Sequence, residues 1–247
     1  MKERLDKLLV SRGLAPSRER AQAYILAGLV WVEDERQTKA GYPVNPEARV
    51  EVRGKDHPYV SRGGVKLAGA LDALAVDPQG MTCLDIGAST GGFTDCLLQR
   101  GAARVFAVDV GYGQLAWEIR QNPRVTVLER TNIRHLSPEA LGTPVELAVM
   151  DLSFISLALV LPSAARFLGP GGLVVALVKP QFEAGREQVG RGGRVNDPLV
   201  HAQVIEEVAQ AARQAGLEPL RWVPSELPGK KSGNQEFFWL LRRGEEQ

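Results

Sequence analysis

Short apolar runs alternate with stretches of helical periodicity from residue 81 to the end of the chain, and this alternation constrains the fold most strongly. Seven runs are predicted strands: 82–86, 105–109, 125–128, 147–151, 173–178, 219–223 and 236–241. Residues 198–215 are a predicted helix that begins after Asp197 as N-cap and ends before Gly216. Strands that alternate with helices are typical of a parallel sheet covered by helices. The sequence therefore predicts an α/β, Rossmann-like, seven-stranded sheet.

The first 55 residues follow a different pattern and are predicted to form a separate small α+β domain. Amphipathic helices are expected at residues 4–10 and 17–27, the second with Ser17 as its N-cap. Short strands are expected at 29–32 and 50–52. We therefore predict three segments: a small domain at 1–55, a linker at 56–60 and the large α/β domain at 61–247.

Charge and hydropathy narrow the class of protein. The 30 basic and 29 acidic residues nearly cancel, but residues 1–32 hold six Lys or Arg against three acids, which suggests a local basic face. The longest apolar run, residues 173–178, has six residues, whereas a membrane-spanning helix needs roughly 20. The N-terminus does not resemble a signal peptide. We expect a cytoplasmic protein without a membrane span, whose two cysteines, Cys83 and Cys96, are buried thiols.

The segment LDIGASTGGF, residues 84–93, joins a predicted strand to a glycine-rich turn and a helix, as in nucleotide-binding sheets. Its glycines, at 87, 91 and 92, do not have the G-x-G-x-x-G spacing that binds a pyrophosphate in dehydrogenases. The carboxylate of Asp85, just before the turn, would also repel a pyrophosphate. It suits the ammonium group of a methionine moiety instead.

A second carboxylate, Asp109, ends the next strand, where it can accept both hydroxyls of an adenosine ribose. Residues 131–133 follow the third strand, where methyltransferases usually contact adenine. These features together predict a site for S-adenosyl-L-methionine. Its expected residues are Asp85, Gly87, Ser89, Gly91, Gly92, Phe93, Asp109, Asn132 and Ile133.

The end of the fourth strand bears on the methyl acceptor. Methyltransferases that act on base amino groups place an Asn or Asp there, followed by two prolines and an aromatic residue. This chain has Asp151-Leu152-Ser153-Phe154 without the prolines, so an amino target is disfavoured but stays open. A cytosine C5 target needs a nucleophilic cysteine, and neither Cys83 nor Cys96 is placed to attack a base.

Four charged residues stand at strand ends or just before the sheet: Lys66, Asp151, Lys179 and Glu236. This series resembles the catalytic tetrad of the FtsJ-like ribose 2′-O-methyltransferases. The N-terminal 2–53 segment resembles the alpha-L RNA-binding module. The segments YVSRGGVKL, LDIGASTGGFTD, MDLSF, LVKPQFE and GNQEF occur in the order found in the TlyA or hemolysin A family of ribosomal RNA methyltransferases, so the resemblance covers nearly the whole chain.

The resemblance implies a methyltransferase that acts on ribosomal RNA or ribosomal subunits, with cytidine ribose as the expected acceptor and no metal. It places Arg4, Arg12, Arg18 and Arg20 on the RNA side, where guanidinium groups suit phosphates. A docking or dimerisation role for the small domain, an RNA-binding protein with an inactive methyltransferase domain, and an RNA base methyltransferase are alternatives. Direct pore formation, which the family name suggests, is disfavoured because no spanning segment or long amphipathic β pattern is present. The oligomeric state is not predicted.

A ribose hydroxyl is a weak nucleophile, so the enzyme must align it and remove its proton. Lys179 is the candidate base. A free lysine has a pKa near ~10.4, and burial or a neighbouring cation such as Lys66 would lower it, whereas Asp151 would stabilise the charged form. We therefore give Asp151 an orienting role and expect Glu236 to hold Lys66 or the ribose.

Residues 184–196, rich in glycine and arginine, lie between the fifth strand and a helix. We interpret them either as a mobile basic lid over the substrate groove or as a disordered linker.

Overall fold

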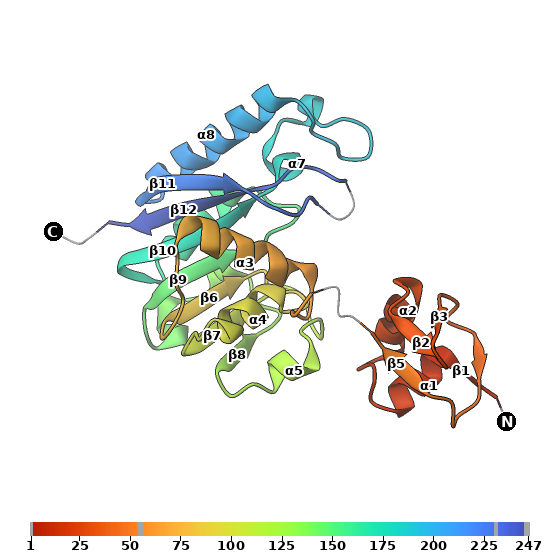
Figure 1. The fold of residues 1–247 in the computed structure, drawn as a ribbon. Coiled ribbons are helices and arrows are strands. Elements are labelled where there is room, and N and C mark those ends of the chain that lie inside the picture. The colour runs from red at the N-terminus through yellow and green to blue at the C-terminus, as the bar shows by residue number, and fades with distance from the viewer. Residues whose placement is uncertain (1, 54–56, 230–231, 245–247) are drawn as a thin grey trace. The chain divides into compact units, whose positions relative to one another are not determined.

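A computed structural model describes residues 2–53, 57–229 and 232–244. The chain divides into two compact units, Met1–Pro58 and Tyr59–Gln247 (Figure 1). Each unit has a hydrophobic core of its own.

The N-terminal unit packs two helices against small sheets. The helices are α1 (Leu5–Ser11) and α2 (Arg18–Leu26). The strands are β1 (Glu3–Arg4), β2 (Val30–Val32), β3 (Glu35–Gln37), β4 (Pro43–Val44) and β5 (Val50–Val52), in an antiparallel sheet of order β3-β2-β5 and a β1-β4 pair. Ser17 caps α2, because its side chain accepts a hydrogen bond of 3.2 Å from the Arg20 N–H. Both predicted helices and both predicted strands are present, and β1, β3 and β4 are additional elements of two or three residues.

The second unit is built on a seven-stranded sheet of order β11-β12-β10-β9-β6-β7-β8. Its strands are β6 (Thr82–Ile86), β7 (Arg104–Val108), β8 (Val125–Leu128), β9 (Val145–Met150), β10 (Leu168–Val178), β11 (Leu217–Pro224) and β12 (Phe237–Arg243). All seven predicted strands are confirmed. Five are parallel, but β12 runs antiparallel between β10 and β11, which the prediction of a parallel sheet missed. The described residues between β11 and β12 contain no helix, and two strands that are joined without a helical crossover pair antiparallel.

Helices cover both faces of this sheet. They are α3 (Arg62–Leu74), α4 (Gly92–Gln99), α5 (Trp117–Arg120), α6 (Leu161–Ala165), α7 (Pro180–Glu183) and α8 (Pro198–Gln214), with 3-10 turns η1 (Ile133–His135), η2 (Pro138–Leu141), η3 (Leu157–Leu159) and η4 (Arg186–Gln188). Along β10, Val174 and Ala176 face a core shared with α6 and α8, whereas Val175 and Leu177 face a core shared with α3 and α4. Because successive side chains face opposite cores, the buried stretch of β10 from Val174 to Val178 is apolar throughout.

Strand register brings distant polar residues to one edge of the sheet. Ile86 pairs with both Val108 and Met150, so the residues that follow these three strands emerge side by side. Val178 pairs with Phe237 on antiparallel β12, so the residue after β10 lies beside the residue before β12. The carboxyl edge of the parallel strands therefore collects the charged residues that the sequence analysis singled out, as open α/β sheets commonly do.

Candidate active site

A small cavity of about 90 Å³ opens at this edge, beside the glycine turn. Its lining residues are Ser61, Gly63, Gly87, Ala88, Ser89, Thr90, Gly92, Phe93 and Asp151. Four of the residues predicted for the cofactor line it, together with Asp151. Ser61 and Gly63 were not predicted, although Ser61 lies two residues before the glycine pair at 63 and 64 and serves as the N-cap of α3. A cap before a helix was the signal that could have identified this second wall of the cavity.

The turn requires glycine because three segments approach one another closely there. Gly87 and Gly91 have φ angles of +87° and +93°, which side chains rarely tolerate. A Cβ on Gly87 would lie 2.8 Å from the backbone oxygen of Asp151, and one on Gly92 would lie 2.1 Å from Ser61 Oγ. Glycine therefore lets the turn pack directly against the segments of Asp151 and Ser61, which line the cavity together with it.

Asp85 lies under this turn and is fully buried. Its Oδ2 accepts a hydrogen bond of 2.6 Å from Thr94 Oγ1, whereas Oδ1 has no partner among the residues described. Burial raises the pKa of Asp85 to about 7, and the Thr94 hydrogen bond opposes that shift. A buried carboxylate with an unsatisfied oxygen is rare, and an ammonium group of a ligand would satisfy it. The residue therefore fits the amino group of S-adenosylmethionine.

We expect Asp85→Asn to stabilise the ligand-free protein as the pH rises. The carboxyl group has a higher pKa in the folded state than the ordinary 3.8, so wild-type stability falls as the pH climbs toward about 7, and the amide has no such loss. The difference in unfolding free energy, variant minus wild type, should grow by roughly 2 to 3 kcal/mol between about pH 5 and pH 8. Urea unfolding at several pH values measures it. A difference that does not change with pH would contradict the buried, ionising carboxyl.

Asp109 and the residues after β8 were predicted to form the other half of the cofactor site. The Asp109 carboxylate accepts hydrogen bonds from the Ser89 N–H at 2.7 Å and the Gly111 N–H at 2.6 Å, so it is held against the glycine turn. Asn132 uses its side chain to cap η1, and Ile133 is buried in the core. Neither lines the cavity, because the 3-10 turn draws Ile133 inward. The glycine turn and the two carboxylates next to it fit an adenosyl and methionine group, but neither Asp85 nor Asp109 lines the cavity, so their contacts, like those of Asn132 and Ile133, stay predictions.

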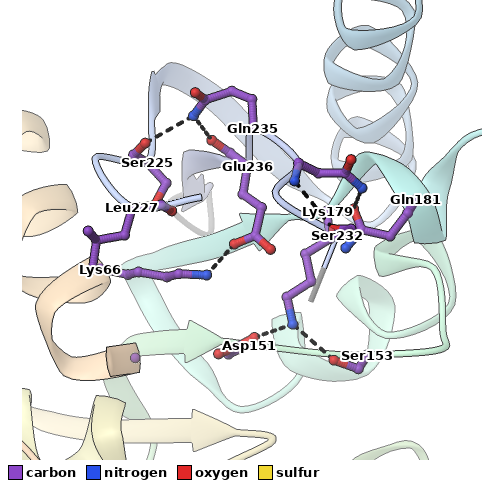
Figure 2. Close-up of polar contacts among 12 residues, drawn as sticks. Lys66, Asp151, Ser153, Lys179, Gln181, Ser225, Leu227, Ser232, Gln235 and Glu236 are labelled. Atoms are coloured by element: carbon purple, nitrogen blue, oxygen red, sulfur yellow. Dashed lines mark hydrogen bonds and ion pairs between the residues drawn. The ribbon is translucent and has the colours of Figure 1, made fainter. Parts of the chain in front are cut away.

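Two ion pairs converge at the same edge (Figure 2). Lys66 Nζ, from α3, lies 2.5 Å from Glu236 Oε2 before β12. Lys179 Nζ, after β10, lies 2.5 Å from Asp151 Oδ1 and 3.0 Å from Ser153 Oγ. The structure thus brings all four predicted catalytic residues together, and Asp151 belongs to both this group and the cavity wall.

The burial of these side chains decides which can meet a substrate. Glu236 is 2% exposed, and the Lys66 side chain is 11% exposed, so this pair is nearly enclosed. Asp151 is more open, with 29% of its side chain exposed beside Lys179. Because each lysine has a carboxylate partner, removal of either carboxylate would leave a largely buried cation, at a cost of about 3 to 5 kcal/mol. Because Asp151 has the most exposed side chain of the four, the pair of Lys179 and Asp151 is the accessible half of the group.

Phe154 is exposed beside the accessible pair. It is 87% exposed and has a φ of +64°, which is unfavourable for a bulky residue, and its ring centre lies 5.0 Å from that of Phe182. Glu183 holds the end of the same loop, since its carboxylate accepts from Ser156 Oγ at 2.7 Å and from the Leu157 N–H at 3.0 Å. An aromatic side chain kept in this conformation offers a flat surface on which a nucleobase could stack.

The four arginines predicted to face RNA all have partners within the N-terminal unit. Arg4 and Arg18 converge on the buried carboxylate of Asp6, each at 3.0 Å, with about half of each side chain exposed. Arg12 donates to the backbone oxygens of Ala48 and Pro46, and Arg20 lies over the ring of Tyr24. The hydrogen bonds from Arg4 hold the pKa of Asp6 well below its usual range. The guanidinium groups are therefore held in place, and their contact with RNA stays a prediction.

Known protein families match both units of the chain, and the match to the larger unit is to a family of methyltransferases. Residues 59–243 match the family described as FtsJ-like methyltransferase, and residues 3–50 match the S4 domain. The 16S/23S rRNA (cytidine-2′-O)-methyltransferase TlyA of Mycobacterium tuberculosis is 51% identical over 240 residues, which cover 97% of this chain and 89% of the relative.

Solved structures also resemble this chain, one of them over nearly its whole length. A hemolysin-type protein of Streptococcus thermophilus has a TM-score of 0.77 and 43% identity, and the match covers 98% of this chain and 89% of that one. A Listeria monocytogenes protein described as an S-adenosylmethionine-dependent methyltransferase shares the fold alone, with a TM-score of 0.53, 16% identity and coverage of 73% of this chain and 100% of that one. Within the described part of the chain, no helix combines the length and apolarity that crossing a membrane requires.

Proposed function

Because the chain belongs to the TlyA or hemolysin A family of FtsJ-like methyltransferases, we propose that it methylates the 2′-hydroxyl of a cytidine ribose in ribosomal RNA. The observation that supports this most is the pairing of two nearly buried lysines with two carboxylates, directly beside the cavity of the glycine turn. Methyl transfer to a hydroxyl needs side chains that align the hydroxyl and a group that takes its proton. It needs little other chemistry from the protein.

The roles of the residues follow from their positions. S-Adenosylmethionine, when bound, supplies a methyl group on a positively charged sulfur. Asp85 would hold its amino group and Asp109 its ribose, while Gly87 allows the turn to lie against Asp151 at the wall of the cavity. Lys179 would take the proton of the 2′-hydroxyl, and Asp151 fixes the direction of its amine. The enclosed pair of Lys66 and Glu236 would complete the wall that orients the ribose.

The structure disfavours a base acceptor of the C5 type. Both cysteines are buried, and burial raises the pKa of Cys83 to about 12 and that of Cys96 to about 11. Thiols with such pKa values are almost entirely protonated near neutral pH, so neither can supply the thiolate that attacks a cytosine ring. A ribose acceptor needs no cysteine.

Mapping of the modified nucleotide tests the proposal. Ribosomal subunits that lack this methylation are incubated with the protein and S-adenosylmethionine, and nuclease digests are analysed by mass spectrometry. We expect the added methyl group on the sugar fragment of a cytidine, and the bond 3′ to that residue should resist alkaline hydrolysis. A methyl group on the base fragment, or none on ribosomal RNA, would contradict the proposed function.

A further inference from the structure

Asn234 is a buried amide that joins three segments of the catalytic unit. It is 1% exposed, and its Nδ2 donates to Gln181 Oε1 at 2.9 Å and to the Gly193 carbonyl at 2.8 Å. Its Oδ1 accepts from the Val195 N–H at 3.1 Å. The carbonyl of Gly193 can only accept and the N–H of Val195 can only donate, so these two backbone groups fix the orientation of the amide.

The three segments are functionally distinct. Gln181 lies in α7, two residues after Lys179, and Asn234 itself lies two residues before Glu236. The third segment comprises residues 190–194, which we call the arginine turn. One side chain thus connects the arginine turn to the two strand ends that carry members of the catalytic group.

The arginine turn is closed by hydrogen bonds within residues 184–196, the segment interpreted from sequence as either a mobile lid or a disordered linker. The Gly190 N–H donates to the Arg194 carbonyl at 2.8 Å, and Gly192 and Gly193 both have a φ of +74°. Val195, the next residue, is 2% exposed and anchors the turn to the core. Such a turn holds its side chains at defined positions and requires glycine at both left-handed sites.

The side chains on this turn are cationic, and none has an acidic partner among the described residues. Arg191 and Arg194 are exposed, and neither has an ion pair with any residue that the structure describes, in contrast to Arg213 and Arg242, which pair with glutamates. Exposed guanidinium groups on a rigid turn are suited to bind phosphate oxygens, often with two hydrogen bonds each.

From these contacts we propose that Asn234 is a positioning residue for RNA binding, which holds the arginine turn so that Arg191 and Arg194 contact backbone phosphates near the target nucleotide. The inference rests on the proposed function, because it assumes that RNA is the substrate. It adds a phosphate-binding surface in the catalytic unit, separate from the arginines of the N-terminal unit.

Asn234→Asp in the full-length protein tests the role of the amide. The carboxylate still accepts from the Val195 N–H, but it places an oxygen against the Gly193 carbonyl, which cannot turn away. We expect the KM for ribosomal RNA to rise about 10-fold and the salt dependence of RNA binding to weaken by about one to two phosphate contacts. S-Adenosylmethionine affinity, measured by calorimetry, should stay within about 2-fold of wild type, since ground-state cofactor contacts are untouched.

Asn196→Asp is the matched control, because it adds the same charge two residues after Arg194, at an exposed position that makes no hydrogen bond with any residue the structure describes. It should keep most of the wild-type affinity. If the two variants weaken RNA binding equally, the effect is one of charge alone and the positioning role is wrong.

Arg191→Gln combined with Arg194→Gln tests the surface without disturbing a buried group. In this variant the salt dependence of RNA binding should weaken as much as in Asn234→Asp. Adding Asn234→Asp to the arginine variant should change RNA affinity little, because the effects of substitutions at coupled residues do not add. Unchanged RNA affinity and salt slope in the arginine variant would overturn the proposal even if Asn234→Asp fails to fold. If the wild type transfers no methyl group to ribosomal RNA, the proposed function fails instead, so the two failures are distinguishable.

Discussion

Lys179→Ala is expected to slow methyl transfer by at least ~100-fold while S-adenosylmethionine and RNA still bind, since a positioned general base contributes about that much. Lys179 Nζ touches Asp151 and Ser153 at the accessible side of the catalytic group, and its removal leaves the glycine turn intact. Single-turnover transfer of labelled methyl groups measures the rate. Raising the pH should restore only part of it, because the missing amine also oriented the acceptor.

Lys179→Arg separates proton removal from charge. Arginine keeps a cation beside Asp151 but stays protonated in proteins, so it cannot accept a proton. We expect this variant to bind both substrates and to remain nearly as slow as the alanine variant. Near-normal turnover in either variant would show that Lys179 is not the base.

Deletion of residues 1–58 is expected to weaken RNA binding by roughly 100-fold at low salt and to leave S-adenosylmethionine binding unchanged. The cavity and the catalytic group lie wholly within residues 59–247, which have their own hydrophobic cores. The N-terminal unit, in contrast, carries the fixed arginines that suit phosphates. Fluorescence anisotropy with RNA fragments over a range of salt concentrations measures both affinity and slope.

The truncated protein should show a shallower salt slope, because fewer counterions are released when fewer phosphates are bound. Calorimetric titration with S-adenosylmethionine and a thermal unfolding curve serve as controls for folding. Equal RNA affinity and an equal slope in the two forms would contradict the RNA-binding role of the N-terminal unit.

The strands of the large unit were predictable because each contains an apolar run, and the central strands β6, β7, β9 and β10 are buried on both faces of the sheet. Helix α3 was not predicted, since Gly63, Gly64 and Gly69 lower its helix propensity, and packing against α4 and the sheet stabilises it instead. The antiparallel direction of β12 was also missed, because hydrophobic periodicity carries no information about strand direction.

The members of the candidate site were predictable, but their partners were not. Lys66 and Glu236 are 170 residues apart in the chain, and only the register of β10 with β12 and the position of α3 bring them together. Asp6 appears in sequence as a surface residue of an amphipathic helix, yet it is fully buried because Arg4 and Arg18 enclose it. Asn234 gives no periodic signal at all, since its role depends on backbone groups of a distant turn.

The central claim is that the acceptor is a ribose hydroxyl. It is tested most directly with two RNA substrates that are identical except for a single 2′-deoxycytidine at the target position. We predict that both bind with similar affinity, that only the ribose form accepts a methyl group, and that the deoxy form competitively inhibits its methylation. Methylation of the deoxy substrate would show that the base is the acceptor and that the lysines do not carry the chemistry.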